Sequence, residues 1–157
     1  MTRRLALLFV ALAFLAGPAR AAGTPQPPLP LQPLTIVAAG GVRHLFEVEV
    51  TRTAAEERTG LMFRRHLAAD HGMLFPLPAP EVAKMWMKHT LIPLDMVFID
   101  AHGIVVHIAE DTVPHSLRIV STPHPVLATL ELQGGITAKL GITVGDKVLF
   151  PLFHTAP

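Results

Sequence analysis

The residues best suited to chemistry lie in one apolar stretch, from Met85 to Phe98. This stretch holds the only tryptophan of the chain and four polar side chains, namely Lys88, His89, Thr90 and Asp95. Polar groups in such a run must be hydrogen-bonded inside the protein or face a pocket, because an unpaired buried polar group is costly. The amine, imidazole and carboxylate are types that acid–base catalysis uses. In the structural alternative, Lys88 and Asp95 pair across a hairpin and Thr90 bonds to its turn.

Arg58 and Arg64 form a second candidate group, close to Glu56 in the sequence. Guanidinium groups bind carboxylates and phosphates through two parallel hydrogen bonds, so this group would suit an anionic ligand. In the structural alternative, Arg58 bonds to carbonyls at the end of a helix, and Arg64 pairs with Asp70 or Asp95.

No standard catalytic motif accompanies these side chains. The sequence has no Gly-x-Ser-x-Gly, no His-Glu-x-x-His and no phosphate-binding loop. It has no cysteine, which excludes disulfides and thiolate metal sites. We therefore expect ligand binding without a cofactor, through residues Arg58, Arg64, Lys88, His89, Thr90 and Asp95.

Methionine and histidine side chains make copper a further alternative. Thioether and imidazole groups suit Cu(I), and five of the six methionines lie between residues 62 and 96. Their scattered spacing is more typical of core packing. Trp86 would suit stacking on a sugar ring, but a single tryptophan in an apolar run is usually buried, so we expect it in the core.

The elements that must position these residues are short strands. Thr53 and Glu56 have the spacing of a capping box, which predicts a short helix that Gly60 ends. A second short helix is predicted over 136–140, and Pro76, Pro78 and Pro80 predict a stiff loop. Strands are predicted over 34–38, 44–50, 73–75, 82–88, 94–99, 104–108, 118–120, 126–132 and 147–150. This spacing favours a mainly β fold, either an antiparallel β-sandwich or a jelly-roll-like, partly closed barrel with two short helices.

The first 21 residues are typical of a signal peptide. Arg3 and Arg4 precede an apolar run, and Ala19-Arg20-Ala21 fits a cleavage site. We expect residues 1–21 to be removed, residues 22–33 to form a proline-rich tether, and residues 34–152 to form a single domain. An uncleaved leader is the alternative, and it is the only membrane contact that we expect.

Export would change the charge of the chain. The full sequence has 13 Lys and Arg and 12 Asp and Glu, and the leader holds three of the basic residues and no acidic one. The mature chain would therefore have a net charge of −2. It has no basic stripe, so we expect no nucleic-acid partner.

Six motifs, found in order over about residues 35 to 150, resemble the DUF192 family. They are Phe46-Glu47-Val48-Glu49-Val50, Thr53-x-x-Glu56-x-Arg58-x-Gly60-Leu61-Met62-Phe63-Arg64, Gly72-Met73-Leu74-Phe75, Trp86-Met87-Lys88-His89-Thr90-Leu91-Ile92-Pro93-Leu94-Asp95-Met96, Leu130-Glu131-Leu132-Gln133-Gly134-Gly135 and Gly141-Ile142-x-x-Gly145-Asp146-Lys147-Val148. The resemblance implies a small sandwich- or jelly-roll-like β domain, often exported in bacteria, whose biochemical role is uncharacterised. It supplies no catalytic residues to carry over. The family usually has Asn where this chain has His89.

These observations lead us to expect a periplasmic or secreted domain that binds a small ligand or a partner protein of the cell envelope. Two alternatives remain at this stage. One is an enzyme that uses Lys88, His89 and Asp95, and the other is a copper-binding protein.

The leader pattern predicts a mature chain that begins at Ala22. N-terminal sequencing of the protein from its own envelope fraction checks this expectation. A chain that still begins at Met1 would favour the membrane-anchored form.

Overall fold

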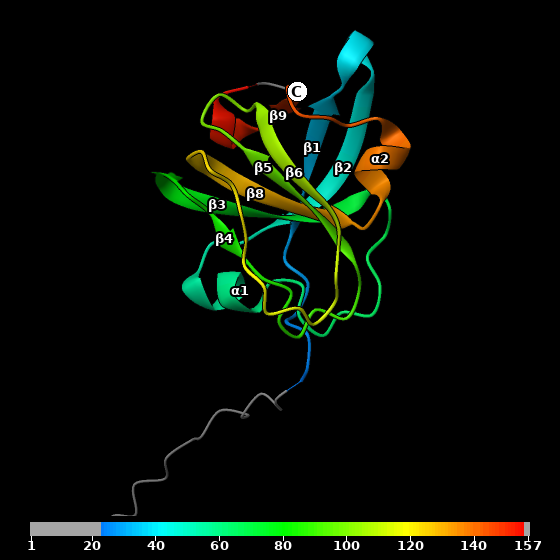
Figure 1. Cartoon of the computed structure of the whole chain (residues 1–157), viewed down its shortest axis with the longest axis vertical. Coiled ribbons are helices and arrows are strands. Elements are labelled where there is room, and N and C mark those ends of the chain that lie inside the picture. Colours follow the sequence, from blue (N-terminus) through cyan, green and yellow to red (C-terminus); the bar gives the residue numbers. More distant parts are fainter. Residues whose placement is uncertain (1–22, 156–157) are drawn as a thin grey trace, which may run out of the picture.

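The computed structural model describes residues 23–155, so the predicted signal peptide lies outside the described residues. Seven strands form one curled sheet in the order β6-β5-β8-β3-β2-β1-β9, and β4 pairs with β7 beside it (Figure 1). The expected mainly β, partly closed architecture with two short α-helices is confirmed. No described helix is both long enough and apolar enough to cross a membrane. The elements are β1 Leu31–Val37, β2 Arg43–Val50, α1 Ala54–Thr59, β3 His71–Glu81, β4 Lys84–Met85, β5 Leu94–Ile99, β6 Val105–Thr112, β7 Val120–Ser121, β8 Val126–Gln133, α2 Ile136–Leu140 and β9 Lys147–Leu149, with 3-10 turns at Ala39–Gly41 and Pro151–Phe153.

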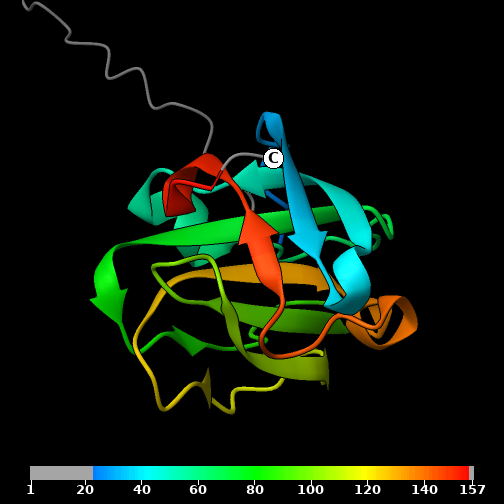
Figure 2. The same ribbon diagram turned by 90° about the horizontal axis from the view of Figure 1, so that it is seen from above.

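The two ends of the sheet approach each other, which closes part of the barrel. Strand β9 pairs with β1, and Lys147 in β9 forms a bridge with Ile104, just before β6 (Figure 2). The amide of Val105 donates to the Asp146 carbonyl at 2.9 Å, and the amide of Val148 donates to the Gly103 carbonyl at 2.7 Å. These bonds join the two ends of the sheet near the β5–β6 turn.

One strand pair departs from the antiparallel pattern predicted by the sequence. Strands β2 and β3 run parallel, from Glu47 beside His71 to Val50 beside Leu74. A parallel pair needs a crossover connection of a dozen or more residues. The connection here, residues 51–70, contains α1 and is long enough to return the chain to the start of the neighbouring strand.

The central strands β3, β5 and β8 are buried on both faces, so the domain has two cores. Inside the curled sheet, Leu74, Val97 and Leu130 pack with residues of β1, β2 and β9. On the outer face, β3 and β5 contribute Met73, Phe75, Met96 and Phe98. These outer residues pack against Leu61, Ala83 and Met87, which come from the segments around α1 and β4. Helix α1 and the β4–β7 pair thus form a second layer over the sheet (Figure 1).

The prolines after Phe75 do not form the predicted loop. Strand β3 continues through Pro76, Pro78 and Pro80 to Glu81. Its pairing with β8 shifts register between Pro76 and Glu81. Proline has no N–H to donate, so it is tolerated where ladder bonds are already missing.

The strand predicted over 82–88 is also shorter than expected. Only Lys84 and Met85 form β4, and the chain from Trp86 to Pro93 is a loop. The Met87 amide donates to the Ser116 carbonyl, and the Thr90 amide donates to the Met87 carbonyl. The latter bond closes a tight turn, which a continuous strand would not allow.

Residues before β1 lie against the domain, where the sequence predicted a tether over residues 22–33. Strand β1 begins at Leu31, three residues before the predicted boundary. The Leu29 amide donates to the Glu49 carboxylate at 2.7 Å. The Gln26 side chain is buried, and its Nε2 donates to the Gly60 carbonyl at 3.0 Å. That carbonyl follows the end of α1, where helix carbonyls lack partners within the helix.

The predicted helix cap is confirmed. Thr53 Oγ1 accepts a hydrogen bond from the Glu56 amide at 3.2 Å, and Glu56 Oε2 accepts one from the Thr53 amide at 3.0 Å. Such a cap contributes about 1 kcal/mol. Gly60 ends the helix at φ 46°, a conformation that favours glycine. The cap and Gly60 therefore set both ends of α1, which forms one wall of the cavity described next.

Candidate functional site

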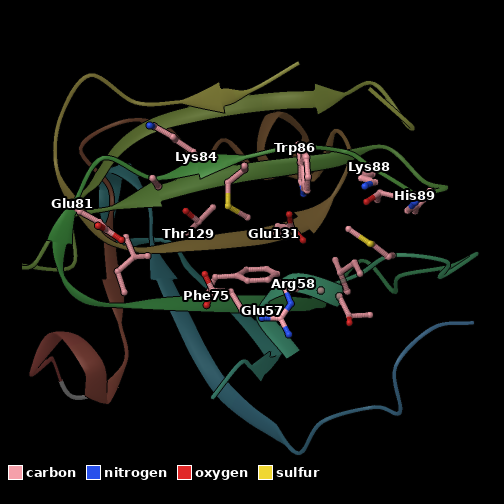
Figure 3. Close-up of a pocket in the computed structure, with 18 of the residues that line it drawn as sticks. Glu57, Arg58, Phe75, Glu81, Lys84, Trp86, Lys88, His89, Thr129 and Glu131 are labelled. Atoms are coloured by element: carbon pink, nitrogen blue, oxygen red, sulfur yellow. The ribbon is translucent and has the colours of Figure 1, made fainter. Parts of the chain in front are cut away.

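A cavity of about 810 Å³ lies between α1, β3, β8 and the segment that contains β4 (Figure 3). This volume lies in the usual range for small-molecule sites. Its apolar walls include Leu61, Met62, Phe75, Leu77 and Met85. Its charged or titratable residues are Glu57, Arg58, Glu81, Lys84, Lys88, His89 and Glu131. The mixture of apolar walls and a few polar groups is typical of a binding pocket.

Strand β8 supplies the floor of the cavity through Thr129 and Glu131. Alternate residues of a strand point to opposite faces. Leu130 therefore points into the inner core, whereas Thr129 and Glu131 point outward, toward the cavity. In the sheet, Glu131 lies between Met73 of β3 and Met96 of β5. In Figure 3, Glu131 lies between Trp86 on one side of the cavity and Arg58 on the other. A carboxyl group is thus held among apolar neighbours beneath the cavity.

Glu131 is a buried carboxyl group without a protein partner. Only 5% of the residue is exposed, and none of the hydrogen bonds formed within residues 23–155 involves its carboxyl oxygens, which keep a small accessible surface toward the cavity. Burial raises the pKa of Glu131 to about 8, because removal from water disfavours the charged form. At pH 7 the carboxyl group is therefore mostly neutral, and it can both donate and accept a hydrogen bond.

Three cations, from three different segments, lie at the mouth of the cavity. They are Arg58 on α1, Lys84 on β4 and Lys88 on the loop after β4. In the described part of the chain, none of the three forms an ion pair. Glu57 and Glu81 also line the cavity. The fixed charges at the mouth therefore include one more cation than carboxylates.

Trp86 lies at this mouth, so the expectation that it is in the core was wrong. It is 45% exposed, and Lys88 Nζ lies 5.2 Å from the centre of its ring. A cation over an indole face is a favourable contact. The adjacent Met87 takes the core position instead. One loop thus supplies both a core side chain and the aromatic rim of the cavity.

His89 and Thr90 line the same cavity. His89 has φ 57°, and its carbonyl accepts the Phe63 amide at 2.9 Å. The side-chain rings of His89 and Phe63 stack, with their centres 5.2 Å apart. The left-handed region is enriched in Asn, Asp and His, so a histidine is tolerated at this position. Thr90 is buried in the turn, and its carbonyl accepts the His115 amide.

Arg64, another predicted site residue, is not brought to the cavity. It forms a two-point ion pair with Glu49, in which Nη2 lies 2.8 Å from Oε2. The predicted partners Asp70 and Asp95 were therefore wrong. Glu49 also accepts the Leu29 amide, so this pair links the segment before β1 to the turn after α1.

Asp95 also lies outside the cavity, and its predicted pairing with Arg64 or Lys88 was wrong. Its side chain is fully buried and accepts four hydrogen bonds. Oδ1 accepts the amides of Asp111 and Gly135 at 2.7 and 2.9 Å. Oδ2 accepts the amide and the hydroxyl of Thr137 at 2.9 and 2.7 Å. The carboxylate therefore joins β5 to β6 and to the start of α2.

The methionines that favoured a copper site are divided between two environments. Met73, Met87 and Met96 are buried in the outer core, whereas Met62 and Met85 line the cavity. Within residues 23–155, no cluster of three or more His, Asp or Glu side chains could hold a metal ion. Most of the thioethers therefore fill the core, as the packing alternative describes.

Sequence reasoning did not identify the floor of the cavity. Glu131 lies in one of the six motifs, but the sequence pattern predicted neither Glu131 nor Thr129 as a site residue. A signal was available, because Glu131 interrupts a strand between Leu130 and Leu132. A carboxyl group in such a position must be paired or must face a pocket.

We predict that Asp95→Ala and Lys88→Ala differ sharply in stability. Asp95→Ala should lose at least about 2 kcal/mol, because it leaves several buried donors without an acceptor. Lys88→Ala should lose less than about 1 kcal/mol, as expected for a partly exposed charge outside an ion pair. Urea denaturation of both variants measures the difference. A large loss for Lys88→Ala would make this residue part of the scaffold.

We also predict that Glu131 makes the domain less stable as the pH rises. The folded-state pKa lies above the unfolded-state value, so the unfolded chain releases this proton first. The contribution of Glu131 to the free energy of unfolding is fully present below about pH 4.5. It decreases progressively as the pH rises to about 8. Glu131→Gln should therefore gain stability relative to the wild type over this range. Glu47→Gln, at an exposed position on β2, is the matched control, and parallel profiles for Glu131→Gln and wild type would contradict the prediction.

Comparisons with known proteins agree with this architecture. The family model of DUF192, described as an uncharacterized ACR, matches residues 35–150. A crystal structure of a protein of unknown function from Novosphingobium aromaticivorans DSM 12444 is 38% identical, with a TM-score of 0.74, and the match covers 86% of this chain and 100% of that one. A crystal structure of a protein from Sinorhizobium meliloti 1021, proposed to be a transcription regulator, is 37% identical, with a TM-score of 0.76. The match covers 78% of this chain and 95% of that one. A comparison with curated proteins gave no match. The chain belongs to the DUF192 family.

Proposed function

We propose that this domain binds a small organic ligand in the cavity between α1 and β8. The observation that carries the proposal is Glu131, a buried carboxyl group that faces the cavity without a protein partner. Burial of such a group without a hydrogen bond lowers stability. Proteins retain costly groups of this kind chiefly where function needs them. A ligand that bonds to Glu131 would satisfy the carboxyl group and fill the apolar walls around it.

The place of action that we propose is the cell envelope or the exterior. The support is the leader pattern in residues 1–21. A partner protein of the envelope remains the other expected type of ligand. A cavity of this volume favours the small molecule, because protein partners generally bind over wide, shallow surfaces.

The enzyme alternative has less support from the geometry. It requires Lys88, His89 and Asp95 in one place, and the Asp95 carboxylate is fully used in holding α2. The idea of transcription regulation, stated for the relative from S. meliloti, does not transfer easily to this chain. A mature chain with a net charge of −2 and no basic stripe is poorly suited to nucleic acid.

Two measurements test the binding proposal. Native mass spectrometry of protein purified from its own envelope fraction should show an added small-molecule mass, which denaturation releases. In vitro, 8-anilinonaphthalene-1-sulfonate is a suitable probe, because it is an apolar aromatic anion. It should bind saturably at one site and quench Trp86, the only tryptophan, at the mouth of the cavity.

A matched pair of variants locates the binding site. Leu77→Asp places a negative charge in the wall of the cavity and should weaken binding of the anionic probe at least about ten-fold. Leu45→Asp adds the same charge at an exposed position outside the cavity and should leave binding unchanged. Thermal melts confirm that both variants fold. Equal binding by both variants, together with a native mass that matches the bare chain, would contradict the proposal.

A further inference from the structure

We infer that the ligand is an organic acid with an apolar body, whose anionic group stays at the mouth of the cavity and whose interior end meets Glu131 as a neutral hydrogen-bonding group. This inference rests on the proposed function. It names the chemical class of the ligand, from the way in which polar groups are distributed between the mouth and the floor of the cavity.

The cations at the mouth favour an anionic group there. Arg58 and Lys84 are exposed and Lys88 is partly exposed, and within residues 23–155 none of them is engaged in an ion pair. They line the cavity from α1, β4 and the following loop, so each of these three segments adds a positive charge to its edge (Figure 3). Guanidinium and ammonium groups form strong charge-assisted hydrogen bonds to carboxylates.

The interior of the cavity favours a neutral, largely apolar group. Leu61, Phe75, Leu77 and Met85 form its walls, and burial of an apolar chain there is favourable by about 25 cal/mol for each Å² removed from water. The neutral carboxyl group of Glu131 does not repel an anion at the mouth. It can donate its O–H to a carbonyl or hydroxyl oxygen that reaches the floor.

The same arrangement makes binding depend on pH. The titratable and charged groups that face Glu131 across the cavity are Glu57 and Arg58 from α1, Glu81 from β3, Lys84 from β4, and Lys88 and His89 from the following loop. Ionisation of Glu131 between pH 7 and pH 9 then places a negative charge beneath the ligand, which should weaken the binding of an acid.

Three probes with the same eight-carbon chain test the charge preference. Octanoate, octan-1-ol and octyltrimethylammonium are titrated at pH 7, with Trp86 emission and calorimetry as readouts. Octanoate should bind about ten-fold tighter than octan-1-ol, and octyltrimethylammonium should bind weakest. Lys88→Gln should reduce the preference for octanoate about three-fold or more. Lys139→Gln, at an exposed position on α2 and outside the cavity, should leave the preference unchanged.

The pH arm of the experiment tests the role of Glu131. Octanoate affinity of the wild type should fall several-fold between pH 7 and pH 9, whereas Glu131→Gln should bind nearly equally at both values. An unchanged wild-type affinity would overturn the assignment of Glu131 as a group that is neutral at pH 7 and ionised beneath the ligand at pH 9.

The remaining outcomes separate the two proposals. Tightest binding of octyltrimethylammonium would overturn the inference and assign Glu131 as an ionised counter-charge, while the cavity remained a binding site. Equal affinity for all three probes would also overturn it, and would leave an apolar pocket without charge selection. Binding of none of the three probes, together with no 8-anilinonaphthalene-1-sulfonate binding and a bare native mass, would remove the proposed function as well.

Discussion

Burial of the central strands on both faces is the constraint on which the rest of the structure depends. Strands β3, β5 and β8 carry apolar side chains toward the interior of the barrel and also toward its outer face. The outer face therefore needs a covering layer, and α1 with the β4–β7 pair supplies it. These elements are short, and they leave part of the face uncovered. The cavity lies in that uncovered part, above Thr129 and Glu131 of β8.

The buried acidic residues divide into scaffold and candidate site according to their partners. Asp95 accepts four hydrogen bonds, and Glu49 pairs with Arg64 and accepts a backbone amide. These hydrogen bonds and the ion pair offset the free energy lost when the two carboxylates leave water. They also join separate elements of the fold. Glu131 has no such compensation within the described residues, although it is as deeply buried as Glu49. The number of partners, and not burial alone, distinguishes the two carboxylates that hold the fold from the carboxyl group that we propose to meet a ligand.

Features determined by local sequence were predicted well. The alternation in β2, the capping box at Thr53, the span of β5 and the helix over 136–140 all depend on neighbouring residues. The cavity depends on distant ones, since Glu131 acquires its environment from register with Met73 and Met96. The strand through the prolines and the exposure of Trp86 were missed because tertiary contacts decide them. Of the predicted site, Arg58, Lys88, His89 and Thr90 reach the cavity, whereas Arg64 and Asp95 do not.

The wide separation of the cavity walls along the chain has a consequence for the order of folding. The β1–β2 and β5–β6 hairpins join neighbouring segments, but the pairing of β3 with β8 joins Gly72 to Leu132. Such non-local pairings form slowly, because a long loop must close before any contact compensates for the lost entropy. The cavity cannot exist before this pairing. A ligand would therefore recognise only the completed sheet, and it would delay global unfolding without assisting the early steps of folding.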